Sequence, residues 1–245
     1  VSLNQGLENA GFSINQELVD FYNNYGADNP EMSIQKQSWT LPEPPVDTYS
    51  DKLIKNAKEY SDVAVVVLSR KAGEGHNDNN SDKYDDFPEG EHYLQLSQTE
   101  KDMVDMVCSN FDDVIVIYNG ANQFEFGFAD EYPQIKSVVW CPGTGNVGFN
   151  ALGKVFSGEV NPSGKTPDTF IYDMTTAPWW NNAEKTEYTN LADMAVEGMN
   201  AGTAQAYAPA FTNYVEDIYV GYKYYETAAQ EGAIDYDKTV QYPFG

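Results

Sequence analysis

The chain has 245 residues, 41% of them hydrophobic and 14% aromatic, which is enough apolar material for one large core or two small ones. Lysine and arginine number 14 against 38 aspartate and glutamate residues, so the formal net charge is −24. Such acidity repels phosphate backbones and anionic lipids, which argues against nucleic acid or a membrane surface as a partner. The sequence shows no bilayer-spanning apolar run and no signal-peptide pattern, and its start at Val1 is typical of a processed or excised chain.

The chain has only two cysteines and two histidines, which limits the metal sites and catalytic triads that it could form. Cys108 and Cys141 are too few for a disulfide framework or a zinc site. A His-based triad would have to use His76 or His92, and the Gly-x-Ser-x-Gly motif of serine hydrolases is absent. These observations argue against serine hydrolase chemistry, and we expect no cofactor.

The N-terminal part reads as helical. Apolar residues at helical spacing predict helices over 3–10 and 16–25, with Asn15 as the N-cap of the second. A proline-bearing stretch over 39–45 predicts an extended connection, and a further helix over 51–60 leads toward the first strand.

Strands and helices then alternate. Apolar, β-branched runs predict strands over 63–69, 114–118 and 137–140, and a helix is expected over 148–156. Between the first two strands, Ser97-Gln98-Thr99-Glu100 forms a capping box that begins another helix. This alternation predicts a parallel or mostly parallel sheet with right-handed crossovers, and strands apolar on both faces indicate a sheet covered by helices.

Glu74 is the main candidate site residue. The run from Ser61 to Asp78, SDVAVVVLSRKAGEGHND, takes a buried strand directly into a Gly-Glu-Gly loop. In such sheets ligands bind at the carboxyl ends of the strands, and Gly73 and Gly75 leave room for a bulky substrate beside the Glu74 carboxylate. The loop from Arg70 to Tyr93 is long and acidic, as functional loops often are. The alternative is a glycine turn that carries a surface glutamate.

Several segments, in this order, resemble the α/β sandwich domain of glycoside hydrolase family 3, the β-glucosidase-like enzymes. They are VVVLSRKAGEG at 65–75, YLQLSQTEK at 93–101, VIVIYNGANQFEF at 114–126, PGTGNVGFNALGKVFSGEVNPSGKTPDTF at 142–170, YVEDIYVGYKYYET at 214–227 and YPFG at 242–245. The resemblance implies an α/β fold, a three-layer α/β/α sandwich with a mostly parallel sheet of about six strands and helices on both faces. The whole chain, 1–245, would be this domain, with lead-in helices and linker at 1–50, a core at 51–175, an irregular insertion at 176–213, and a final strand and tail at 214–245.

The resemblance also implies the chemistry of a retaining glycosidase, in which one carboxylate attacks the anomeric carbon and a second acts as acid and base. Glu74 matches the family's acid/base. The nucleophilic Asp of the family lies in a TIM barrel, which is absent from this chain, so the isolated chain is expected to be inactive. Its partners would be a β-glucoside or oligosaccharide substrate and the TIM-barrel domain of the same parent protein, with no nucleic acid and no membrane.

One departure from the family lies just after the loop glycines. The family commonly has an aspartate two positions beyond Gly-Glu-Gly, whereas this chain continues His76-Asn77-Asp78. We expect Gly73, Gly75, His76 and Asp78 to line the sugar site, and a solvated loop histidine is the alternative for His76.

A calcium loop is a rival interpretation of the same segment. Oxygen-bearing residues occupy the ligand positions of an EF-hand loop, at Asp78, Asn80, Asp82, Tyr84, Asp86 and Glu89. Lys83 stands where that loop needs glycine, and a strand precedes it, so the interpretation is the weaker one.

A second class of function also stays open, a carbohydrate- or partner-binding module without catalysis. Its ligand would stack on the aromatic pair Trp179-Trp180 and on the tyrosines of 219–225, although anchoring of an irregular tail is the commoner role of such rings. The acidity suits a secreted or cell-surface bacterial enzyme, and a cytoplasmic location remains open. The glycoside cleaved is also open, with β-glucosides as the family default.

Overall fold

The computed structural model describes residues 1–30, 43–70, 87–180 and 210–245, together with 186–187, 190, 196–197 and 206–207. The α-helices are α1 (Leu3–Asn9), α2 (Gln16–Asp28), α3 (Asp51–Tyr60), α4 (Gln98–Asn110), α5 (Phe149–Phe156), α7 (Tyr222–Gln230) and α8 (Tyr236–Thr239). The strands are β1 (Val63–Ser69), β2 (Asp113–Asn119), β3 (Ile135–Trp140), β4 (Phe170–Ile171), β5 (Thr186–Glu187), β6 (Val196–Glu197), β7 (Ala206–Tyr207), β8 (Ala210–Phe211) and β9 (Val240–Tyr242).

The central sheet is parallel, in the order β1-β2-β3. Its middle strand, β2, carries Val114, Val116, Ile117 and Tyr118, which are all fully buried. The short strands β4 and β9 form a separate antiparallel pair. The predicted α/β class is thus confirmed, and the described residues show three parallel strands where about six were expected.

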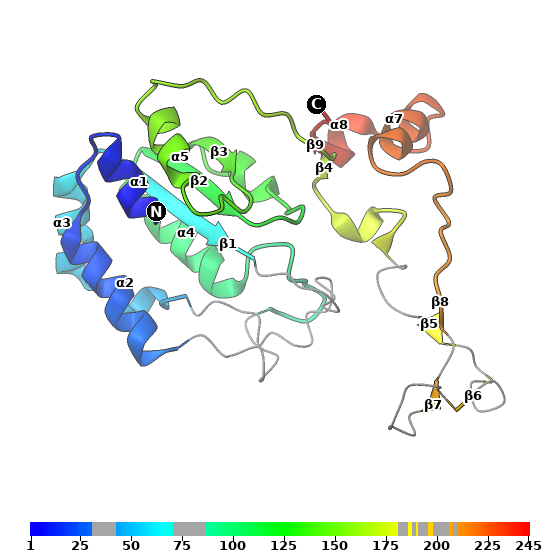
Figure 1. Ribbon diagram of the computed structural model, residues 1–245, viewed down its shortest axis with the longest axis horizontal. Coiled ribbons are helices and arrows are strands. Elements are labelled where there is room, and N and C mark those ends of the chain that lie inside the picture. The colour runs from blue at the N-terminus through cyan, green and yellow to red at the C-terminus, as the bar shows by residue number, and fades with distance from the viewer. Residues whose placement is uncertain are drawn as a thin grey trace.

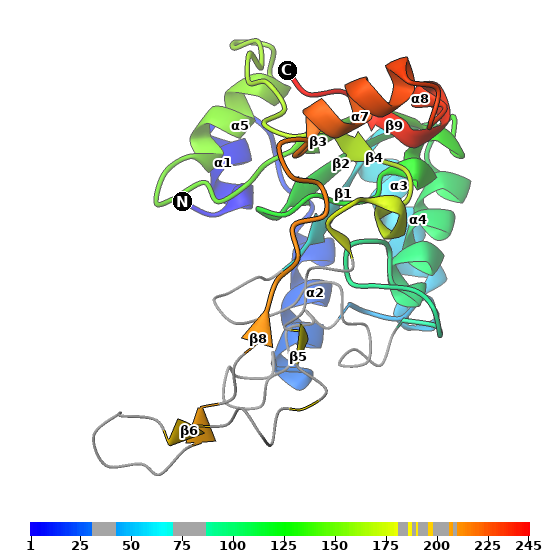
Figure 2. The same ribbon diagram turned by 90° about the vertical axis from the view of Figure 1, so that its right-hand side faces the viewer.

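Helices lie on both sides of this sheet. Figure 2 shows α1 and α5 on one side of it and α3 and α4 on the other. Helix α4 begins with the predicted capping box and directs Met103, Val104 and Cys108 into the same core cluster as Val66 and Val116 of the sheet. The predicted N-cap Asn15 also accepts a hydrogen bond from the Leu18 backbone, at the start of α2.

The edge strand β1 departs from the sequence-based expectation. Its apolar run predicted burial on both faces, but the side chains of Val63, Val65 and Val67 are exposed while Val66 and Leu68 are buried. Within the described part of the chain, β1 pairs with β2 on one side only. Because β1 is an edge strand, its side chains are flanked by a neighbouring strand on one side only and are less covered than those of β2. Composition alone does not distinguish an edge strand from a central one.

Helices α1 and α5 approach each other through two glycines. A Cβ atom added at Gly153 would lie 2.2 Å from the carbonyl oxygen of Gly6, and one added at Gly6 would lie 2.2 Å from that of Phe149. We expect Gly153→Ala to lower the free energy of unfolding by about 1–3 kcal/mol, because the helices must separate. Urea unfolding measures the loss. Gly26→Ala in α2, where the added methyl meets open space, is the matched control. Equal effects of the two substitutions would contradict the close contact.

The C-terminal part packs beside the sheet (Figure 1). Within the insertion predicted at 176–213, the structure describes two antiparallel strand pairs, β5–β8 and β6–β7. Residues 214–221 run without regular structure into α7, and the last strand, β9, lies near the C-terminus. Trp179 and Trp180 are half-buried and pack against the cluster that contains Tyr225. This packing favours anchoring over sugar stacking for those rings.

Among the described helices, none has the length and apolar character needed to cross a membrane.

Candidate active site

The residues predicted to contact substrate all fall in the segment 71–86, outside the described part of the chain. This applies to Gly73, Glu74, Gly75, His76 and Asp78. Of the possible calcium ligands only Glu89 is described, so that interpretation stays a prediction. Elsewhere in the described ranges, no group of three or more His, Cys, Asp or Glu side chains could hold a metal ion. The structure does describe both flanks of this segment, ending at Arg70 and resuming at Phe87.

The carboxyl ends of the three parallel strands share one edge of the sheet. Ser69 at the end of β1 is in register with Asn119 at the end of β2, and Tyr118 is in register with Trp140 of β3. The Asn119 side-chain amide donates to the Cys141 carbonyl at 2.8 Å. The Trp140 indole N–H donates to the Gly120 carbonyl at 2.8 Å. These hydrogen bonds connect the chain segments that follow β2 and β3. They lie at the same edge of the sheet at which β1 ends, just before the segment 71–86.

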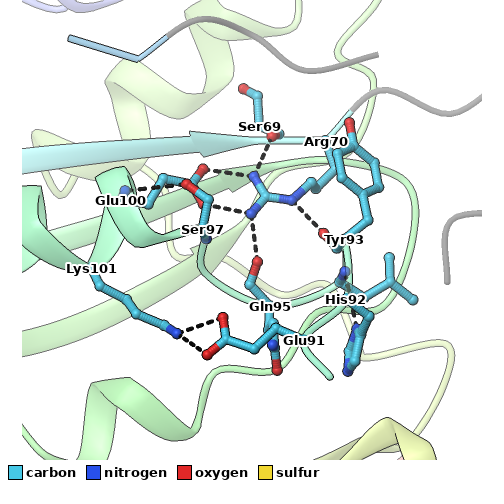
Figure 3. Close-up of polar contacts among 10 residues, drawn as sticks. Ser69, Arg70, Glu91, His92, Tyr93, Gln95, Ser97, Glu100 and Lys101 are labelled. Carbon is cyan, nitrogen blue, oxygen red and sulfur yellow. Dashed lines mark hydrogen bonds and ion pairs between the residues drawn. The ribbon is translucent and has the colours of Figure 1, made fainter. Parts of the chain in front are cut away.

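Arg70 is the first residue after β1, and its guanidinium makes five hydrogen bonds (Figure 3). Three go to backbone carbonyls: Nη1 donates to Ser69 at 2.8 Å, Nε to Tyr93 at 2.6 Å and Nη2 to Gln95 at 2.6 Å. The other two go to the Glu100 carboxylate, from Nη1 to Oε1 at 2.6 Å and from Nη2 to Oε2 at 2.5 Å. Arg70 thus connects the end of β1, the segment before α4, and α4 itself.

This ion pair is buried and lies beside three aromatic rings. The Arg70 and Glu100 side chains are each 4% exposed. The guanidinium lies 4.8 Å from the ring centre of Phe124, 5.1 Å from that of Tyr93 and 5.9 Å from that of Phe87. Burial alone would lower the pKa of the Arg70 guanidinium, but the hydrogen bonds and charge of Glu100 raise it above its usual value. Arg70 therefore stays charged, and its partner is fixed.

Glu100 also takes part in the capping box at the start of α4. Its Oε2 accepts a hydrogen bond from the Ser97 backbone N–H at 2.9 Å, while the Glu100 N–H donates to Ser97 Oγ. In a half-buried position beside this cap, Lys101 Nζ contacts both carboxylate oxygens of Glu91, at 2.6 and 2.7 Å. Figure 3 shows both pairs between α4 and the preceding segment. The sequence indicated the cap, but the pairing of Glu100 with a residue 30 positions earlier had no local signal.

His92 belongs to a second buried network. The Leu94 backbone N–H donates to His92 Nδ1 at 3.2 Å, which leaves Nε2 to carry the proton and donate to Glu125 Oε1 at 3.1 Å. Glu125 Oε1 also accepts from the Met174 backbone N–H at 2.6 Å. The network ties the segment before α4 to the loop after β2 and to the residues after β4. His92 is therefore a structural residue in the described part of the chain.

The charges of both Glu100 and Arg70 affect the pKa of the Glu43 carboxyl group. Burial, and then the negative charge of Glu100, raise the Glu43 pKa to about 7, against a smaller lowering effect of Arg70. Because the folded-state pKa exceeds the ordinary 4.5, ionisation of Glu43 destabilises the fold progressively as the pH rises above 4.5, and the penalty reaches its full size above about pH 7. This penalty disappears only as the pH falls below 4.5, where Glu43 is protonated in both the folded and the unfolded state.

We expect Glu43→Gln to raise the free energy of unfolding by about 1 kcal/mol at pH 8, allowing for the partial exposure of Glu43, and to change it little at pH 5. Chemical unfolding at the two pH values measures both effects. A gain of the same size at pH 5 and pH 8 would contradict the raised pKa.

Comparison with known proteins identifies the family. The family model for the glycosyl hydrolase family 3 C-terminal domain matches residues 3–222. A β-glucosidase of Ruminococcus albus is 31% identical over 248 aligned residues, covering 99% of this chain and 21% of that protein. β-Glucosidase A of Butyrivibrio fibrisolvens is also 31% identical, over 95% of this chain and 26% of that protein.

Solved structures agree. A β-glucosidase from Paenibacillus barengoltzii superposes with a TM-score of 0.69 and 27% identity over 100% of this chain and 23% of its own. β-Glucosidase 3B from Thermotoga neapolitana, solved in complex with glucose, gives a TM-score of 0.69 and 27% identity over 94% of this chain and 28% of its own. The chain belongs to glycoside hydrolase family 3, as its C-terminal-type α/β domain. It spans between a fifth and a third of the length of these relatives.

Proposed function

We propose that this chain is the sandwich domain of a retaining β-glucosidase-type glycoside hydrolase and supplies Glu74 as the general acid/base. A TIM-barrel domain of the same parent protein would carry the nucleophilic aspartate. Since the two carboxyl groups of a retaining enzyme lie about 5 Å apart, Glu74 must reach across a domain interface to act. The substrate would be a β-glucoside or oligosaccharide, with Gly73, Gly75, His76 and Asp78 beside the sugar.

The observation that carries the proposal is the place where the Glu74 segment joins the fold. It follows β1 directly, at the edge of a parallel sheet where α/β proteins bind ligands. Arg70, immediately before the segment, is among the most firmly held side chains at that edge. Family membership and the β-glucosidase names of the relatives supply the reaction class.

The protonation chemistry sets a requirement on Glu74. To donate a proton near neutral pH, its pKa must be raised to about 6, as desolvation does in the well-studied glycosidase case. We propose that closure of sugar and barrel domain over the segment provides this desolvation. Expulsion of the leaving group then draws the proton from Glu74, and the resulting carboxylate activates the water that releases the sugar.

Catalytic incompleteness of the isolated chain is the direct test. We expect the purified 245-residue chain to release no aryl alcohol from an aryl β-glucoside above the background rate, while the parent protein turns it over. Isothermal titration of the isolated chain with cello-oligosaccharides should show no binding, because half of the subsite is missing. Turnover by the isolated chain would contradict the divided active site, and tight sugar binding without turnover would favour a binding module.

A further inference from the structure

We propose that Arg70 and Glu100 are positioning residues that help to place the proton donor, by fixing the chain before and after the segment that carries it. The proposal rests on the proposed function of Glu74. Every contact that supports it lies in the described residues on either side of the segment 71–86 (Figure 3).

The first argument is the nature of the atoms that Arg70 holds. Its donors bind the carbonyl oxygens of Ser69, on the near side of the segment, and of Tyr93 and Gln95, on the far side. Tyr93 and Gln95 follow Arg70 by 23 and 25 positions in the chain. Bonds to backbone atoms locate the chain itself, whereas bonds to flexible side-chain tips would not. One planar group therefore sets the separation of the two flanks.

The second argument is the role of Glu100. The guanidinium needs a counter-charge in a dry site, and Glu100 supplies it from the first turn of α4 through two parallel hydrogen bonds. The capping bond from Ser97 keeps the carboxylate from turning away. The position of α4, packed on the sheet through Met103 and Val104, is thereby transmitted to Arg70.

The third argument compares stability with positioning. A buried ion pair is a poor means of stabilising a core, since well-packed apolar residues often do as well or better. The fork geometry of arginine instead supplies precision, and Glu74 follows only four residues after Arg70, at most about 14 Å of extended chain. A displacement of about 1 Å at a catalytic group can cost about 100-fold in rate. The predicted consequence is a defect in proton donation that exceeds any effect on substrate binding.

The test uses the parent protein and compares Arg70→Lys, Glu100→Gln, Glu74→Ala and Val116→Ala. Arg70→Lys keeps a positive charge beside Glu100 but loses the fork that reaches the Tyr93 and Gln95 carbonyls. Glu100→Gln keeps the shape of the side chain and a carbonyl acceptor for Ser97, and it serves if Arg70→Lys does not fold. Val116→Ala weakens the buried centre of β2 and controls for loss of stability alone. All assays run well below each variant's melting temperature.

The readout is kcat/KM for a series of β-glucosides whose leaving groups range from alkyl alcohols to dinitrophenol. Poor leaving groups need a proton from the acid, while activated ones leave without it. For Arg70→Lys and Glu100→Gln we expect kcat/KM to fall about 10- to 100-fold on poor leaving groups and less than about threefold on activated ones. Val116→Ala should lower kcat/KM by the same factor for all substrates.

The outcomes separate the two claims. If Arg70→Lys and Glu100→Gln scale all substrates equally, as Val116→Ala does, while Glu74→Ala loses only the poor leaving groups, the positioning role is refuted and the proposed function stands. If Glu74→Ala itself shows no dependence on the leaving group, the proposed function fails and the positioning role fails with it.

Discussion

The Phe126→Ala substitution is expected to lower the free energy of unfolding by about 3–5 kcal/mol, a large share of the stability of a domain this size. Phe126 is 2% exposed and joins elements that are far apart in sequence. Its ring centre lies 5.5 Å from that of Tyr118 in β2, 5.7 Å from that of Phe170 in β4 and 6.3 Å from that of Tyr242 in β9. Removing it opens a cavity where the parallel sheet meets the β4–β9 pair.

Urea unfolding of the isolated chain measures this loss. Tyr214→Ala is the matched control, because it removes an aromatic ring that is 72% exposed and should change the free energy of unfolding by less than about 0.5 kcal/mol. Losses of similar size at the two positions would show that the sheet and the β4–β9 pair do not share a core.

The Arg70→Met substitution is the second large effect, with an expected loss of about 3–5 kcal/mol. It leaves the Glu100 carboxylate buried without its counter-charge and takes the donor away from the Tyr93 and Gln95 carbonyls. The double variant Arg70→Met/Glu100→Gln removes the stranded charge, so we expect it to lose less than the sum of the two single variants. The difference measures the coupling of the pair.

A surface pair gives the comparison for this cycle. Lys55 and Glu59 form an i,i+4 pair in α3 with side chains 75% and 69% exposed, and their coupling should stay below about 0.5 kcal/mol. Additive losses at Arg70 and Glu100 would mean that the two groups do not depend on each other for burial. That result would also weaken the positioning role that we propose for them.

Much of the sheet could be predicted from local patterns. The run of alanine, valine and leucine located β1 at 63–69 to the residue, and the Ser97–Glu100 spacing located the start of α4. Parallel pairing followed from the alternation of strands and helices. These features depend on residues that are close in sequence, so their signals survive in a single sequence.

Features that depend on distant residues were not predicted. The Gly6–Gly153 contact joins α1 and α5, and the Arg70–Glu100 pair joins the end of β1 to α4. Neither has a periodicity or motif that reports it. The part expected to hold a final strand and tail, 214–245, also contains the helix α7, which begins directly after Gly221, whose φ is 60°. The sequence shows that Ile218, Tyr219 and Val220 are apolar or aromatic, but it does not show that their side chains are exposed.

Azide rescue of Glu74→Ala in the parent protein tests the central claim most directly. With an aryl β-glucoside whose activated leaving group needs no proton, the variant should form the glycosyl intermediate and then stall, because no base activates water. Azide needs no base, so we predict that it restores turnover and yields β-glucosyl azide, while activity on poor leaving groups stays lost. Wild-type rates in Glu74→Ala, or no effect of azide, would contradict the assignment of Glu74 as the acid/base.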